Sequence, residues 1–165
     1  MIVNAYRSKL GQTGYVAVVA EGGQYLCDGR KVFENVDTVV DFCRRQLKID
    51  EMAEEHVEVL AMDAKNHLQG VFEVSVGAVN AAIVPVREIF QKLLALNAVG
   101  FIVVHNHPSG DAVPSDEDNA ITKKLYEASK IMDVTMIDHV IVGNYGGQYS
   151  YRASGVVINE QRLVK

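Results

Sequence analysis

The hydrophobic positions of this chain follow two periods, and the change from one to the other predicts the order of its strands and helices. Alternating or continuous apolar runs predict strands at residues 2–7, 14–21, 56–62, 68–76, 99–105 and 134–142, with closing strands at 148–152 and 156–158. Apolar residues at helical spacing predict helices at 36–48, 85–97 and 115–132. Mixed strands with intervening helices indicate an α/β fold, a three-layer α/β/α domain around a mixed sheet.

An acidic connector, residues 50–55, divides this pattern into two parts. We interpret residues 51–165 as the main domain. Residues 1–50 carry short strands with Gly turns and a single helix, and we interpret them as an N-terminal α+β addition packed on the same domain. A chain of 165 residues is long enough to bury a core of this kind.

Composition and charge exclude several classes of protein. The chain is 48% hydrophobic and 22% charged, as in a soluble globular protein, and its net charge of -5 argues against non-specific DNA binding as the main function. Its apolar runs fall far short of the ~18 residues of a membrane span, and its N-terminus does not resemble a signal peptide. Cys27 and Cys43 form no paired motif, so we expect reduced thiols in a cytoplasmic protein.

The candidate chemistry lies in the stretch FIVVHNHPSGDAVPSDED, residues 101–118. Side chains alternate across a strand, so His105 and His107 face the same way and Asn106 faces the other. They come at the end of a buried strand, where α/β sheets usually place their sites. Two adjacent imidazoles are suitable zinc ligands, although two spaced histidines are often structural.

Asp118 is the candidate for a third metal ligand. Ser115 followed by Asp118 resembles a capping box, which would explain both residues without a metal. Asp118 also shares a helix face with Ile121 and Leu125, and that face points inward. A cation would stabilise a buried carboxylate there. His105, His107 and Asp118 would leave one tetrahedral position open, as in a catalytic zinc site, and Ser115 could donate to a developing oxyanion.

The stretch resembles the JAMM (MPN+) metallopeptidase signature, in which His-x-His-Pro is followed by Ser-x-x-Asp. It is more closely similar to the RadC family, which is named historically for DNA repair, through the phrases GVFEVSVGAVNAAIVPVREIF, LNAVGFIVVHNHPSGDAVPSDEDNAITKKL, MIDHVIVG and YSY over roughly residues 53–158. The resemblance implies a JAMM-type fold related to the cytidine deaminases, a catalytic zinc, and hydrolysis of a peptide or isopeptide bond. It implies that His105, His107 and Asp118 are the zinc ligands and that Ser115 helps to stabilise the tetrahedral intermediate.

The resemblance also implies a general-base glutamate upstream. Counting back from Asp63, the aspartate of the turn after the strand, places this base at Glu55. Parity agrees, because Glu55 shares a face with Val57 and Val59. Glu58 is the competitor, inside the strand and on its other face.

Other interpretations use the same residues. A cytidine deaminase would need His-x-Glu and Pro-Cys-x-x-Cys, and neither cysteine is placed for that signature. An HNH nuclease disperses its named residues along the chain instead of placing them consecutively. A non-catalytic metal-binding scaffold or a DNA-repair accessory module is the alternative to a hydrolase. Residues 1–50 lack the helix-hairpin-helix pattern of longer RadC relatives, which weakens the inference of DNA targeting.

His139 could orient a ligand, but we favour a core histidine bonded to backbone.

Overall fold

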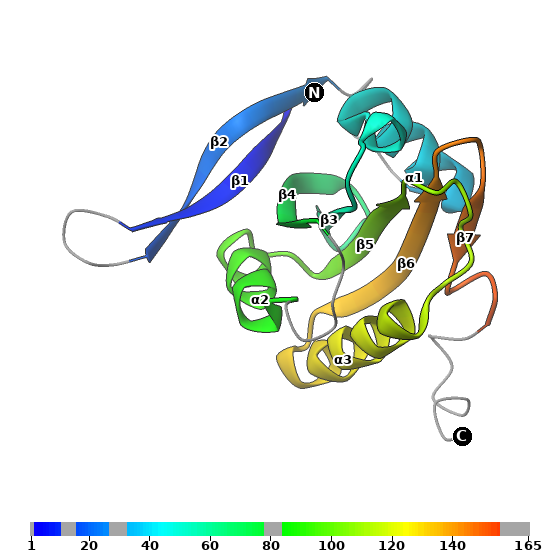
Figure 1. Cartoon of the computed structure of the whole chain (residues 1–165). Helices are drawn as coiled ribbons and strands as arrows, with labels where there is room; N and C mark the ends of the chain where they lie inside the picture. The colour runs from blue at the N-terminus through cyan, green and yellow to red at the C-terminus, as the bar shows by residue number, and fades with distance from the viewer. Residues whose placement is uncertain (1, 11–15, 27–32, 78–83, 156–165) are drawn as a thin grey trace.

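A computed structural model of the chain describes residues 2–10, 16–26, 33–77 and 84–155, and these ranges form one mixed sheet with helices on both faces (Figure 1). The sheet order is β2-β1-β4-β3-β5-β6-β7. The strands are β1 Ile2–Leu10, β2 Val16–Leu26, β3 His56–Met62, β4 Leu68–Val76, β5 Gly100–His107, β6 Thr135–Gly143 and β7 Gln148–Ser150. β1 runs parallel to β4 and β5 parallel to β6, whereas the other neighbours are antiparallel.

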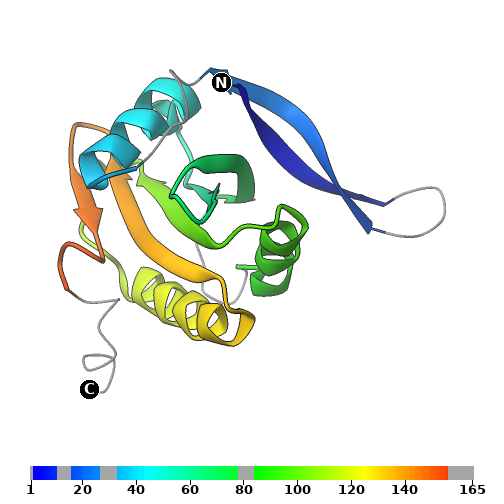
Figure 2. The same cartoon turned by 180° about the vertical axis from the view of Figure 1, so that it is seen from behind.

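The helices form two layers, one on each face of the sheet (Figures 1 and 2). Helix α1, Val36–Phe42, continues into a π-helical turn, Cys43–Leu47, and covers one face. Helices α2, Val86–Ala95, and α3, Asp116–Met132, cover the other. This arrangement confirms the predicted α/β fold with a mixed central sheet.

Strand β5 lies between β3 and β6 and separates the two hydrophobic cores. Phe101 and Val103 pack into the core under α2 and α3, whereas Ile102 and Val104 pack into the core under α1. Each fully buried side chain of this kind contributes about 1.5–3 kcal/mol. Burial on both faces therefore holds the strand that ends in the two histidines rigidly in place.

Element boundaries differ from the sequence prediction in a few places. The helix predicted at 36–48 is α-helical only to Phe42, and Lys48, at φ 57, ends the turn that follows. The first closing strand is shorter than predicted, and the one predicted at 156–158 lies outside the described residues. The hairpin of strands 56–62 and 68–76 is confirmed at those residues.

The N-terminal strands form a long hairpin that projects from the rest of the molecule (Figure 2). β1 joins the sheet where Asn4 pairs with Gly70 and Ala5 pairs with Val71. The hairpin thus extends the same sheet, while a domain boundary at residue 50 stays a prediction. No helix in the described ranges is long and apolar enough to span a membrane.

Candidate metal centre

Strand β5 and helix α3 bring His105, His107 and Asp118 together. His105 Nε2 lies 3.0 Å from His107 Nε2 and 3.1 Å from an Asp118 carboxylate oxygen. His107 Nε2 lies 3.4 Å from the other carboxylate oxygen. A tetrahedral zinc with bonds of about 2.0–2.1 Å separates its ligand atoms by about 3.3 Å. The three side chains therefore fit zinc in both donor type and spacing.

Helix α3 carries Asp118 in its first turn, and Ser115 is the N-cap. The Ser115 hydroxyl accepts from the Asp118 backbone N–H and lies 2.5 Å from the Asp118 carboxylate, which also accepts from the Ser115 backbone N–H. The capping box is complete, and the same carboxylate, 2% exposed, faces the histidines. The helix cap and the ligand position are two functions of one residue pair.

The electrostatics of this cluster depend on the carboxylate. Burial opposes ionisation of Asp118, but the contacts with His105 and His107 outweigh it and hold the pKa of this carboxyl well below its usual range. The hydrogen bond to Asp118 raises the pKa of the His107 ring against partial burial, and the charge of Glu55 adds to this rise. The cluster therefore favours a positive charge at its centre, from a proton or a metal ion.

The loop between β5 and α3 orients the His107 ring. Its Nδ1 lies 2.7 Å from the carbonyl oxygen of Asp111, so Nδ1 donates and Nε2 of the neutral ring keeps its lone pair toward the cluster. The loop packs tightly on Gly143 at the end of β6, where an added Cβ would lie 2.3 Å from the Gly110 carbonyl oxygen. Only glycine at 143 permits this approach, and Gly110 directly precedes Asp111, whose carbonyl contacts His107.

Asn106, which faces away from its two neighbours, fastens the segment that carries Glu55. The Asn106 side chain is fully buried, accepts from the backbone N–H of His56 at 2.7 Å and donates to the carbonyl of Glu54 at 3.0 Å. Both partners flank Glu55. The middle residue of His-Asn-His thus ties the candidate base to the strand that presents the histidines, a role that the sequence reading missed.

Glu55 directly precedes β3, whereas Glu58 lies within it. Val57 pairs with His105, so the register extended by two residues places Glu55 opposite His107. Glu58 pairs with Val104, whose side chain is in the core on the α1 face. Glu58 therefore faces away from the cluster, while half-buried Glu55 is near enough for its charge to act on His107.

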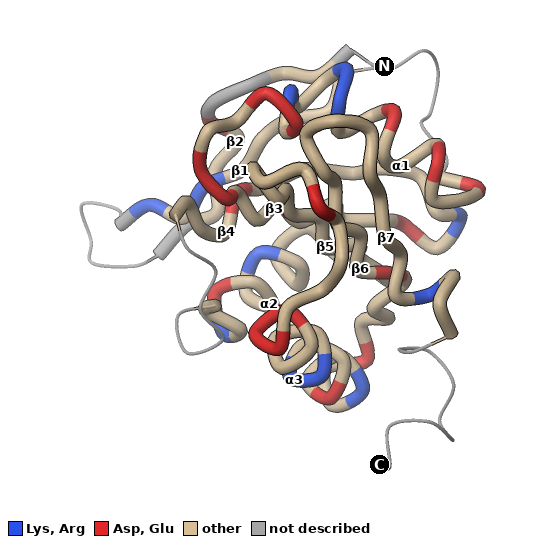
Figure 3. The backbone as a smooth tube through the Cα atoms, turned by 45° about the vertical axis from the view of Figure 1, so that its right-hand side comes forward, with Lys and Arg blue, Asp and Glu red and all other residues tan. Residues whose placement is uncertain are grey.

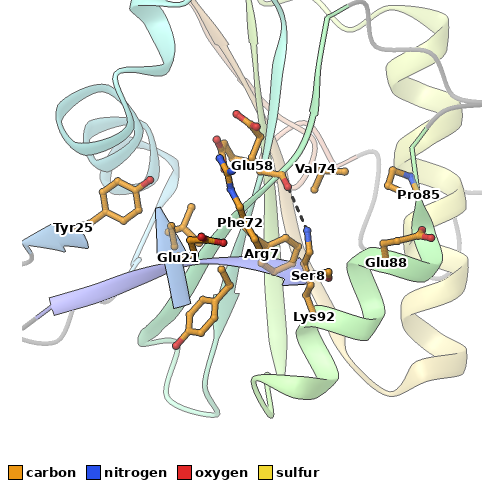
Figure 4. Close-up of a pocket in the computed structure, with 14 residues that line it drawn as sticks. Arg7, Ser8, Glu21, Tyr25, Glu58, Phe72, Val74, Pro85, Glu88 and Lys92 are labelled. Carbon is orange, nitrogen blue, oxygen red and sulfur yellow. Dashed lines mark hydrogen bonds between the residues drawn. The ribbon is translucent and has the colours of Figure 1, made fainter. Parts of the chain in front are cut away.

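Glu58 instead lines a separate pocket of about 430 Å³ between the hairpin, β4 and α2 (Figure 4). Burial raises the pKa of Glu58 to about 8, and the neighbouring charge of Glu73 adds to the rise while Lys92 opposes it. Lys92 bonds the Glu73 carbonyl, and within the described residues the Glu58 carboxylate has no hydrogen bond or ion pair. This pocket holds none of the cluster residues.

His139 is a buried histidine, as predicted, but its ring has other partners than we expected. The prediction of a core histidine is confirmed, since His139 is 1% exposed, but the predicted bond to backbone is wrong: Nε2 lies 2.8 Å from His105 Nδ1 and Nδ1 lies 2.6 Å from the Thr122 hydroxyl. Burial, with the charge on His105 adding to it, lowers the pKa of His139 well below its ordinary value, so the ring is neutral. The sequence offered no signal for Thr122.

Fold and cluster together define an α/β protein with a candidate two-histidine, one-aspartate metal site at the end of a central strand. The family model of the RadC-like JAB domain matches residues 33–156, so the chain belongs to this family. The match begins ahead of residue 51, where we placed the start of the main domain.

Three similar curated proteins are each named UPF0758 protein, a name that states no activity. The UPF0758 protein of Roseiflexus castenholzii is 38% identical over 111 residues, covering 67% of this chain and 47% of the relative. That of Syntrophomonas wolfei is 39% identical over 133 residues, covering 78% and 55%, and that of Methanococcoides burtonii is 41% identical over 107 residues, covering 65% and 46%. The chain thus spans about half the length of the curated relatives it matches.

Proposed function

We propose that this protein is a zinc-dependent hydrolase that cleaves a peptide or isopeptide bond in a peptide or protein substrate. The observation that carries the proposal is the convergence of His105, His107 and Asp118, with ligand atoms all within 4.8 Å of one another. Three protein ligands leave a position for water or substrate, which is typical of catalytic zinc. Zinc bound there would lower the pKa of a water to about 7 and polarise a substrate carbonyl.

Glu55 would act as general base and then general acid. Its charge is near enough to His107 to affect that ring, and Asn106 fixes the backbone on both sides of it. A carboxylate so placed takes a proton from the attacking water and passes it to the leaving amine. Its competitor Glu58 pairs with Val104, whose side chain packs in the core under α1, and this supports the choice of Glu55.

Ser115 would stabilise the oxyanion that forms at the substrate carbonyl. Ser115 is exposed, and its hydroxyl donates a hydrogen bond to the Asp118 carboxylate. Rotation about the Cβ–Oγ bond turns the hydroxyl hydrogen toward a substrate while the oxygen still accepts from the Asp118 N–H. One such donor is typically worth about 10²–10³ in kcat.

The charge distribution favours a protein substrate over a nucleic acid. Figure 3 shows Lys and Arg dispersed over several elements with acidic residues between them, and the first turn of α3 is acidic. With a net charge of -5, the chain offers phosphates little attraction. We therefore propose an amide-bond substrate in spite of the repair-related family name.

Metal content and hydrolysis test the proposal in three proteins expressed with added zinc: wild type, His107→Ala and the control His67→Ala. His67 is hydrogen-bonded to Asp63 in a turn outside the cluster. We expect about one zinc in wild type and His67→Ala, a loss in His107→Ala, and cleavage of isopeptide-linked or peptide substrates by the two loaded proteins alone. Wild type with under about a tenth of an equivalent of zinc would overturn the metal site. Equal zinc in His107→Ala would overturn the ligand assignment, and zinc without hydrolysis of any amide would indicate a metal-binding scaffold.

A further inference from the structure

A buried row of side chains connects the backbone of helix α3 to the His105 ring. The Thr122 hydroxyl lies 2.6 Å from the Asp118 carbonyl oxygen and 2.6 Å from His139 Nδ1, and His139 Nε2 lies 2.8 Å from His105 Nδ1. Thr122, His139 and His105 are each 1% exposed. Water therefore cannot replace any hydrogen bond in this row, and each proton must have one defined place.

The helix carbonyl fixes the direction of every hydrogen bond in the row. A carbonyl oxygen only accepts, so the single hydroxyl hydrogen of Thr122 is given to Asp118. The Thr122 oxygen then accepts from His139 Nδ1–H. A neutral imidazole carries one N–H, so His139 Nε2 accepts, and its donor is His105 Nδ1–H.

The consequence appears at the cluster. With its hydrogen on Nδ1, the neutral His105 ring turns the lone pair of Nε2 toward His107 and Asp118. The reverse order would place a hydrogen on His105 Nε2, aimed at the position of the metal. The same tautomer arises at His107 by the shorter route of a direct bond to the Asp111 carbonyl.

We propose that Thr122 and His139 are positioning residues that set the tautomer and orientation of His105 for metal binding. The inference rests on the proposed metal site and adds the means by which one ligand is prepared. Tyr151 supports it, because its ring stacks on His139 at a centroid distance of 5.1 Å and an interplanar angle of 8°, which fixes the plane of the imidazole. Partners of metal-bound histidines are commonly carboxylates or carbonyls, and here a second imidazole transmits the effect of a carbonyl.

Zinc affinity in matched hydroxyl variants tests this proposal. Thr122→Val removes the hydroxyl at nearly constant shape, and Thr122→Ser keeps it. Ser129→Ala is the control, because Ser129 is a buried hydroxyl on the same helix that bonds the Tyr126 carbonyl away from the cluster. In competition with a chromophoric chelator, we expect Thr122→Val to weaken zinc binding by about 10–100-fold, with Thr122→Ser and Ser129→Ala within about 3-fold of wild type. Wild-type affinity in folded Thr122→Val would overturn the proposal.

The tautomers themselves provide a readout that needs no metal. Long-range ¹H–¹⁵N spectra of metal-free wild type at about pH 8 should place the hydrogen of His139 on Nδ1 and that of His105 on Nδ1. A hydrogen on His139 Nε2 would overturn the relay even if Thr122→Val fails to fold. Absence of zinc binding by wild type would instead count against the proposed function, while the spectra would still decide the relay.

Discussion

The histidine cluster and the Glu58 pocket are both polar, and they differ in how their polar groups are partnered. In the cluster, Asp118 is buried and accepts hydrogen bonds from Ser115, and the ligand atoms of three side chains lie within 4.8 Å of one another. In the pocket, which has a volume of about 430 Å³, the Glu58 carboxylate has no hydrogen bond within the described residues. The comparison teaches that the candidate metal site is marked by converging ligand atoms and satisfied hydrogen bonds, and not by the size of a cavity.

The largest expected difference between the two regions is in catalysis. Glu55→Gln should lower kcat by about 10²–10⁴-fold with zinc retained, because an amide cannot exchange the proton. Glu58→Gln should leave the rate within about 3-fold of wild type, since Glu58 is remote from the reacting atoms. Hydrolysis rates of the zinc-loaded variants on one isopeptide substrate measure both. Similar rates for Glu55→Gln and wild type would remove Glu55 as the base.

Asn106→Leu should break the connection between the histidines and Glu55. The substitution keeps the volume but leaves the His56 N–H and the Glu54 carbonyl without partners, which should destabilise folding by about 2–3 kcal/mol. We expect kcat to fall more than zinc affinity, because the displaced segment carries the base and not the ligands. If zinc affinity falls while kcat per bound zinc is unchanged, the clamp acts on the metal site and not on Glu55.

Glu58→Gln should stabilise the protein at neutral pH. The pKa of Glu58 is about 8 in the folded state against an ordinary 4.5, so the folded state favours the protonated form. Its contribution to stability is fully present below 4.5 and is lost as pH rises toward 8. At pH 8 the neutral glutamine should add about 1–2 kcal/mol to the free energy of unfolding, and at pH 4 almost nothing. Urea unfolding of wild type and Glu58→Gln at the two pH values checks this. An equal change in the free energy of unfolding at both would show that ionisation of Glu58 does not destabilise the folded state.

Asp63 provides the smallest effect and the opposite sign. Burial opposes its ionisation, but hydrogen bonds from His67 and from the Lys65 N–H lower the pKa of Asp63 to about 2 from an ordinary 3.8. Its stabilising contribution is present above 3.8 and is lost as pH falls through about 2. Thermal unfolding of Asp63→Asn should therefore approach that of wild type between these values. A constant gap down to pH 2 would mean that the charge of Asp63 contributes nothing.

The sequence predicted most of the fold because the strongly periodic segments form elements wherever they can bury their apolar faces. β3, β4 and the long helix α3 begin and end within a residue of their predicted bounds. The end of α1 was less well predicted, because the π-helical turn that follows depends on packing of Cys43 and Leu47 under the sheet. The local pattern of apolar residues contains no information on how Cys43 and Leu47 pack against the sheet.

The sequence by itself determined that His105 and His107 share a face and that Asp118 lies one turn into a helix, because strand and helix periods fix these relations locally. Only the tertiary structure decided what meets across elements. The pairing of β3 with β5 brings Asn106 to the backbone around Glu55 and sets that segment beside the histidines, and the packing of α3 on β6 joins Thr122 to His139. These contacts join residues distant in sequence, and their geometry follows from burial of two cores against one sheet.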